Sequence, residues 1–103
     1  FKNAKVDLTT TNATTLYTCP TATTAIVKSI LVSEDSNNAD TLTLTLTNAS
    51  SAVFSIYKDK AVSAKQTLEL LSAPLVVEES EILKVTAATA DRLHVVASIL
   101  EVS

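Results

Sequence analysis

The amino-acid sequence predicts an all-β domain of the antiparallel β-sandwich or jelly-roll kind. The clearest evidence is Thr41–Thr47, in which threonine alternates with Leu42, Leu44 and Leu46. In a β-strand this two-residue period places the leucines on one face and the threonines on the other. Eight or nine short segments of strand-forming residues follow one another at roughly ten-residue spacing, which is typical of sandwiches and jelly rolls. The many Thr and Val residues, which are stiff at χ1, favour the same structure.

Nine segments are candidates for these strands. They are Lys5–Thr9, Thr15–Cys19, Ala25–Ser33, Thr41–Thr47, Ala52–Lys58, Thr67–Leu71, Leu75–Val77, Glu81–Thr86 and Leu93–Val102. Ala25–Ser33 is almost continuously apolar, as expected of a strand that is covered on both faces. The residues expected in the core are Leu42, Leu44, Leu46, Ile26, Ile30, Val53, Val85 and Val95. Ala61–Leu71 leaves an alternative open, because its apolar residues also fit one face of a short helix.

The turns between these segments must form without glycine, because the sequence contains none. Two of them, Ser36–Asp40 and Asn48–Ser51, are rich in Asn, Asp and Ser. Asn and Asp tolerate a positive φ and close Asx-turns, so we expect them to replace glycine.

The size and composition of the chain predict a single domain that associates with other chains. A chain of 103 residues is long enough for one domain, 1–103, with its own core. Its single cysteine excludes an internal disulfide. Hydrophobic residues make up 47% of the chain and charged residues only 18%, so few charges are left to cover the surface of so small a domain. We therefore expect apolar surface to contact further copies of the same chain, in a homo-oligomer.

Neither nucleic acid nor a membrane is expected as a partner. The net charge is -3, and the eight Lys and Arg residues are scattered singly, whereas phosphate binding needs clustered cations. The longest largely apolar stretch, Leu70–Val77, is too short to span a bilayer and is interrupted by Ser72 and Pro74.

Cys19 and His94 are the only thiol and the only imidazole, and thus the one pair that could act as nucleophile and base. Cys19 ends an expected strand directly before Pro20, away from the helix N-termini and cations that activate catalytic thiols. His94 alternates with Leu93 and Val95 in another expected strand. A strand-face histidine and a half-buried thiol are the simpler interpretation, so we predict no catalytic residues and no enzyme.

Metal and cofactor sites are also not expected. One Cys and one His cannot supply the ligands of a zinc site. Asp35–Asp40 has side-chain oxygens at alternating positions, but it lacks the glycine and the bidentate glutamate of an EF-hand loop, so a hydrated turn is favoured over a calcium site. Glu78, Glu79 and Glu81 are better explained as a solvated turn than as paired catalytic carboxylates.

The threonine face of Thr41–Thr47 leaves two binding functions to consider. An ice-binding surface needs this spacing on several adjacent strands, and only one strand has it. Sugar binding relies on aromatic platforms, and the aromatic residues are limited to Phe1, Tyr17, Phe54 and Tyr57. A carbohydrate- or receptor-binding module is therefore the alternative from another functional class, and a rim of aromatic residues at one end of the sandwich would favour it.

Several segments carry a resemblance to a known family. Leu16–Pro20 (L-Y-T-C-P), followed by Thr24–Val32 (T-A-I-V-K-S-I-L-V), resembles the start of small β-sandwich virion proteins of tailed bacteriophages, especially marine ones. The second half is similar to the same proteins at Thr67–Leu71, Pro74–Glu78, Leu83–Ala87 and Val95–Glu101. The resemblance extends from about Leu16 to Val102 and consists of strands and turns, with no catalytic signature.

This resemblance implies a structural component of the virion, assembled in the cytoplasm of a host bacterium. The favoured role is a head decoration (cement) protein, which binds the major capsid protein on the outside of the head and stabilises it; the alternative is a neck, tail or fibre module. The resemblance also favours a trimer, which would match the local threefold axes of a capsid. The sequence departs from its relatives where they have glycine, at Thr21–Ala22 and Glu79–Ser80. These two turns are therefore expected to use another geometry.

Overall fold

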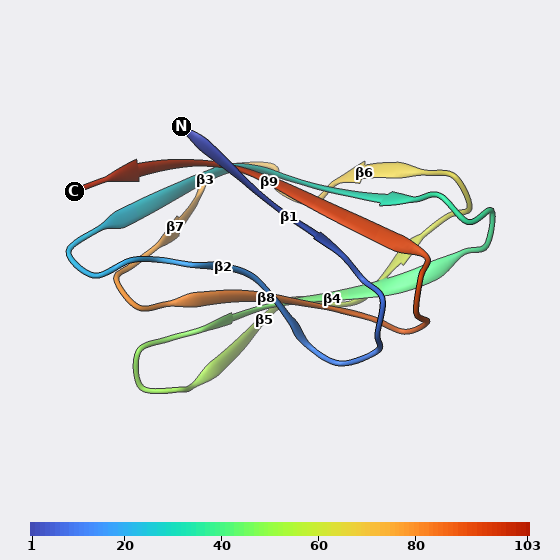
Figure 1. Ribbon diagram of the computed structural model, residues 1–103, viewed down its shortest axis with the longest axis horizontal. Coiled ribbons are helices and arrows are strands. Elements are labelled where there is room, and N and C mark those ends of the chain that lie inside the picture. Colours follow the sequence, from blue (N-terminus) through green and yellow to red (C-terminus); the bar gives the residue numbers. More distant parts are fainter.

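A computed structural model describes residues 1–103 and consists of nine strands with no helix (Figure 1). The strands are β1 (Lys2–Asp7), β2 (Thr14–Thr18), β3 (Thr24–Glu34), β4 (Asp40–Thr47), β5 (Val53–Val62), β6 (Thr67–Glu69), β7 (Leu75–Val77), β8 (Ile82–Ala87) and β9 (Leu93–Val102). Each predicted segment contains a strand, which confirms the all-β fold class. The structure contains no helix of the length and apolarity that a membrane span requires.

The nine strands form two antiparallel sheets that pack face to face (Figure 1). Sheet A has the order β1-β9-β3-β6, with β7 also pairing with β3, and sheet B has the order β2-β8-β4-β5. The first strand pairs with the last, β2 pairs with β8, β3 pairs with β6 and β7, and β4 pairs with β5. This is the order of a long hairpin rolled into two sheets, so the sandwich is a jelly roll.

The core lies between the sheets and contains twenty buried hydrophobic residues. Five of the eight residues predicted for the core have no exposed surface: Leu42, Leu44, Ile30, Val85 and Val95. Leu46 is partly buried and packs against this core. The alternation of Thr41–Thr47 therefore places its leucines as the sequence predicts, with the threonines on the opposite face of β4.

Two core predictions are wrong, and both errors have a local cause. The pairing of β3 with β9 shifts register between Val27 and Ser29, so β3 contains a bulge at Lys28. The extra residue changes which residues face inward: Ala25 and Val27 are buried before the bulge, and Ile30 is buried after it. Ile26 consequently lies on the outer face and is only half-buried.

Val53 is the second error. It is 62% exposed, because it pairs with Thr47 on the outer face of sheet B. Its strand, β5, is the edge strand of that sheet, and the β4–β5 pairing contains two register shifts.

The helical alternative for Ala61–Leu71 is also wrong. β5 continues to Val62, and a turn joins it to β6, with Gln66 N–H donating to the Ser63 carbonyl oxygen (3.0 Å). Lys65 has a φ of 59°, which no right-handed helix contains.

Seven residues have a positive φ, and none is glycine. They are Ala22, Asn37, Ser51, Asp59, Lys65, Ser80 and Asp91. In the first of the two predicted turns Asn37 has the positive φ, as expected. In the second the left-handed residue is Ser51, while the Asn48 side chain accepts the N–H groups of Ser50 and Ala52 (3.0 Å each), as an Asx-turn does. The two turns expected to use another geometry, Thr21–Ala22 and Glu79–Ser80, contain Ala22 and Ser80 with φ of 55° and 66°. Each turn therefore contains a residue in the left-handed region, which glycine favours, and places a Cβ where it costs energy.

Ala22→Gly is expected to raise the free energy of unfolding by about 0.5–1 kcal/mol, because removal of the Cβ relieves left-handed strain that exceeds the added entropy of the unfolded chain. Ala49→Gly is the matched control, since Ala49 is an exposed turn residue outside the left-handed set. The control should leave stability unchanged or lower it. Urea denaturation of both variants measures the difference, and equal effects would contradict the strain argument.

Candidate functional site

The structure does not bring Cys19 and His94 together. Cys19 follows β2 in the core, close to Tyr17, whose hydroxyl contacts Glu101 near the end of β9. His94 lies near the start of β9, seven residues from Glu101, which is roughly 23 Å along a strand. The imidazole also lies on the outer face of sheet A, since the neighbouring Leu93 and Val95 point into the core.

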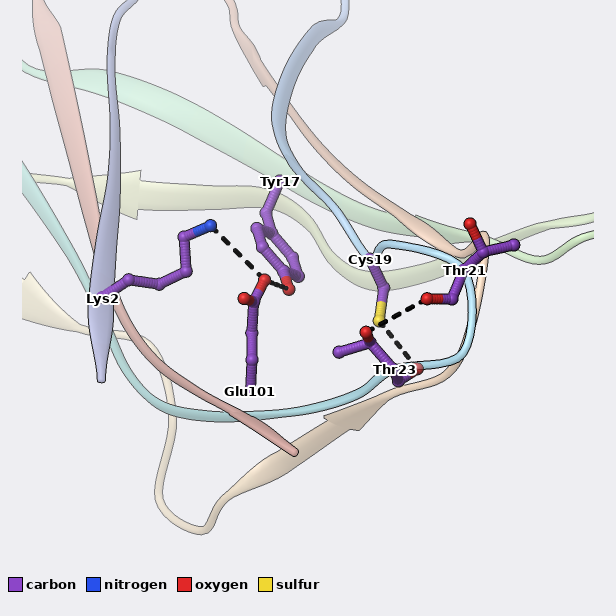
Figure 2. A network of polar contacts seen from close by, with 6 residues as sticks. All are labelled: Lys2, Tyr17, Cys19, Thr21, Thr23 and Glu101. Carbon is purple, nitrogen blue, oxygen red and sulfur yellow. Dashed lines mark hydrogen bonds and ion pairs between the residues drawn. The ribbon is translucent and has the colours of Figure 1, made fainter. Parts of the chain in front are cut away.

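The environment of Cys19 disfavours a thiolate. Burial raises the pKa of the thiol, which is opposite to the change that activates a nucleophilic cysteine. The thiol donates a hydrogen bond to the Thr23 carbonyl oxygen (3.3 Å), and the Thr23 hydroxyl donates to the Thr21 carbonyl oxygen (3.2 Å) (Figure 2). Cys19 is thus bonded within the β2–β3 turn.

A polar network joins the two sheets at this end of the sandwich (Figure 2). Tyr17 of sheet B donates its hydroxyl proton to the carboxylate of Glu101 in sheet A, and Lys2 Nζ lies 3.4 Å from the same carboxylate oxygen. Burial raises the pKa of Tyr17, and the hydrogen bond to Glu101 raises it further. The same hydrogen bond lowers the pKa of Glu101. The tyrosine is held neutral and the glutamate ionised, which suits a structural link between the sheets.

A second polar cluster lies at the opposite end of β9. His94 Nε2 is 3.2 Å from Asp7 Oδ1, and His94 Nδ1 is 3.4 Å from Asp35 Oδ2. The two carboxylates therefore contact opposite nitrogens of one ring and do not converge on a common point. Across the whole chain, no group of three or more His, Cys, Asp or Glu side chains is placed to hold a metal ion.

The carboxylate of Glu34, at the end of β3, organises the segment that was considered as a calcium loop. Glu34 is 2% exposed and accepts hydrogen bonds from the backbone N–H groups of Ser36 (2.9 Å), Asn38 (3.2 Å) and Lys65 (3.0 Å), as well as from the Ser36 hydroxyl. Burial alone would raise the pKa of Glu34, but these hydrogen bonds outweigh it and hold the pKa at about 2. The loop thus presents its backbone N–H groups, and not a ring of oxygens, to its centre.

The turn between β7 and β8 contains Glu78, Glu79 and Glu81, whose side chains do not share a common contact. Glu81 accepts the N–H of Glu78 (2.8 Å), and Glu79 accepts the N–H of Ala22 from a neighbouring turn. Their carboxylates thus bond to turn backbone, in agreement with the predicted turn.

Sequence reasoning overlooked Glu34, Glu69 and Glu101 as structural residues. Glu69 accepts hydrogen bonds from the N–H groups of Ile30 (2.9 Å) and Leu71 (3.1 Å) and from the Ser29 hydroxyl, so it stabilises β3 just after its bulge. Only Glu101 had a recognisable signal, because it is a charged residue at an inward-facing position of a predicted strand.

The two outer faces of the sandwich differ in chemistry. The outer face of sheet B carries the threonines of β4 with Thr86, Thr15 and Thr18 of the neighbouring strands, but Lys84 lies between Thr45 and Thr15. The outer face of sheet A is apolar over much of β3, β7 and β9. Its apolar residues are Ile26, Leu31, Val76, Val96, Leu100 and Val102, of which Val76 is 52% exposed and Leu31 40% exposed.

Three open hollows lie on the surface, and that of about 310 Å³ is lined by Asp7, His94 and Val96, among others, so it includes the His94–Asp7 contact described above. One of about 350 Å³ is lined by Asp40, Thr89 and Arg92, among others. Asp40 accepts the Thr89 N–H (3.1 Å) and Arg92 donates to the Ala39 carbonyl oxygen (2.9 Å), so both side chains are bonded within the chain. Another of about 290 Å³ lies between β5 and the β6–β7 connection and is mostly apolar.

Compared with protein-family models and with curated proteins, the chain matches none.

Proposed function

We propose that this chain is a structural protein of a bacteriophage virion, and specifically a decoration protein that binds the outside of the capsid as a homo-oligomer and stabilises the head. Its role would be mechanical: a compact domain bridges neighbouring subunits and adds contact area that resists internal pressure. The catalytic and metal-binding arrangements considered for the sequence have no part in this role.

The observation that carries the proposal is the apolar outer face of sheet A. Monomeric soluble domains rarely leave a contiguous apolar patch uncovered, and such a patch usually marks a protein interface. The central strands β3 and β9 expose Leu31 and Val96 side by side, and Leu100 lies next to Ile26 in the same two strands. A domain that functions by packing against other chains accounts for this surface, which a sandwich on its own leaves in water.

The fold and the placement of the aromatic residues give further support. Jelly rolls are common in viral capsid domains, although the same architecture occurs in lectins and cupins, so this support is by analogy. The rival carbohydrate-binding function needs exposed aromatic platforms. Tyr17 is buried, and Tyr57 is half-buried with its hydroxyl bonded to the Leu70 carbonyl oxygen (2.6 Å). Neither of these two rings forms such a platform. Phe1 and Phe54 are exposed, but Phe1 precedes β1 of sheet A whereas Phe54 lies in β5 of sheet B, so the two rings do not share a sheet.

The test is binding to heads of the phage that carries the protein, prepared without it. We expect the purified chain to co-sediment with empty heads in a saturable manner and to raise the temperature at which the heads open. Cryo-electron microscopy of the intact particle would then place the chain on the outer capsid surface. Density in the neck, tail or fibre, with no binding to heads, would contradict the decoration role and support the alternative virion module.

A further inference from the structure

One row of residues across the outer face of sheet A carries opposite charges at its two ends. Register places four residues in one row across the sheet: Lys5, Val96, Leu31 and Glu69. The row begins with a cation on the edge strand β1, continues with two apolar residues on the central strands, and ends with an anion on the edge strand β6. The carboxylate of this anion, Glu69, is held in place by its hydrogen bonds within the chain and remains negatively charged. We refer to this row, with the apolar row of Leu100, Ile26 and Val76, as the sheet A face.

Such a pattern complements itself under one particular rotation. In this arrangement two copies pack face to face through sheet A, and the two-fold axis runs parallel to the strands between β9 and β3. Each row then lies opposite the same row of the second copy, with its residues in reverse order. Lys5 then faces Glu69 of a second copy, and Val96 faces Leu31. In the other apolar row Leu100 faces Ile26. A two-fold axis across the strands through this row would instead place Lys5 against Lys5. An axis across the strands between Lys5 and Asp7 would pair these two charges, but it would place Val96 against His94 and leave the row of Leu100 uncovered, because β9 begins at Leu93. Charge and apolar contact together therefore favour the axis along the strands.

We infer that the sheet A face binds the sheet A face of a second copy of this chain, forming a two-fold dimer in which Lys5 pairs with Glu69 and Val96 packs against Leu31. This inference rests on the proposed function as a self-associating structural protein, and it names the surface and the symmetry. The dimer differs from the trimer that the phage resemblance favours, because a patch that complements itself forms a closed pair.

The size and texture of the sheet A face suit this packing. β3 and β9 have eleven and ten residues, so four neighbouring strands present on the order of 500 Å² in projection. The accessible area is larger than the projected area, because side chains protrude from the sheet. It therefore approaches the roughly 800 Å² per partner of a standard interface. Ser29 and Ser98 lie between the two apolar rows and allow a close approach. Lys28, at the bulge, is exposed, and its flexible stem can carry the ammonium group to the rim.

Sedimentation equilibrium of the purified chain provides the first test. We expect twice the mass of one 10.9 kDa chain. Val96→Asp should give a monomer, because it buries an unpaired charge at the centre of the interface. The matched control is Thr86→Asp, which places the same charge on a central strand of the outer face of sheet B and should leave the dimer intact. At low salt, Lys5→Glu should weaken the dimer about tenfold, whereas Lys84→Glu should not.

Chemical cross-linking of introduced cysteines tests the register without relying on a disruptive variant. Val96→Cys and Leu31→Cys are made in separate chains, and the buried Cys19 is not expected to compete. Because sheets stack about 10 Å apart, beyond the reach of a disulfide, the thiols are joined with a short bis-maleimide. A mixture of the two chains should form a covalent heterodimer faster than either chain alone forms a homodimer. Equal cross-linking of one variant alone and of the mixture would overturn the proposed axis, and so would a wild-type monomer or trimer. A dimer that ignores phage heads would retain this inference and refute the decoration function; a monomer that binds heads would do the reverse.

Discussion

Leu44→Ala is expected to lower the free energy of unfolding by about 2–5 kcal/mol, because it removes a large side chain from a site that cannot collapse around the cavity. Leu44 has no exposed surface. It lies in β4, between Val85 of β8 and Tyr57 of β5, so strands flank it on both sides and sheet A covers it. Chemical denaturation followed by circular dichroism measures the loss.

Thr43→Ala is the control for this experiment, since Thr43 is the preceding residue and lies on the opposite face of the same strand. Its hydroxyl oxygen accepts one hydrogen bond, from the Asp59 N–H (3.1 Å). Its loss should cost about 0.5–1.5 kcal/mol. Equal losses for the two variants would mean that the assignment of the two faces of β4 is wrong.

Glu34 is expected to make the fold sensitive to acid. Its pKa is held at about 2, below the ordinary value of 4.5. A carboxyl group with a lower pKa in the folded protein than in the unfolded chain stabilises the fold only while it is ionised. Its contribution is thus fully present above pH 4.5 and is lost as the pH falls toward 2. Glu69 and Glu101, whose pKa values are also lowered, contribute in the same direction.

Glu34→Gln isolates this contribution. The amide cannot accept all four hydrogen bonds with the strength of a carboxylate, so the variant should be less stable than the wild type at pH 7. Its stability should also fall less steeply between pH 4.5 and pH 2. Glu78→Gln, at an exposed position with no side-chain hydrogen bond, is the matched control and should keep the wild-type acid transition. If Glu34→Gln retained the wild-type slope, the buried carboxylate would not be the acid-sensitive group.

The sequence alone predicted the strands of this protein and five of its fully buried core residues. Leu75–Val77 and Leu93–Val102 form strands with the predicted bounds, and the leucines of β4 face inward. The reason is that a sandwich covers one face of each strand, so the two-residue alternation of apolar residues records which face is covered. The apolar outer surfaces of β3 and β9 were likewise visible in their nearly continuous apolar composition.

The role of Glu34 could not be predicted in this way. It ends a predicted strand like any polar residue before a turn, and one of its donors, the N–H of Lys65, comes from a turn thirty-one positions away. The same holds for Tyr17 and Glu101, which are eighty-four positions apart and meet only because β2 and β9 lie in facing sheets. Contacts of this kind depend on strand order, which local residue patterns do not contain.

The direction in which Ile26 and Val53 point was decided only by the tertiary structure. An alternating pattern determines the relative faces of residues along a strand only while the strand is regular. A bulge at Lys28 reverses the alternation within β3, and pairing with Thr47 turns Val53 outward on an edge strand. Both effects arise from hydrogen bonding to neighbouring strands. A bulge, for example, is an extra residue in one strand opposite a single residue of the partner strand, so it cannot be identified without that partner.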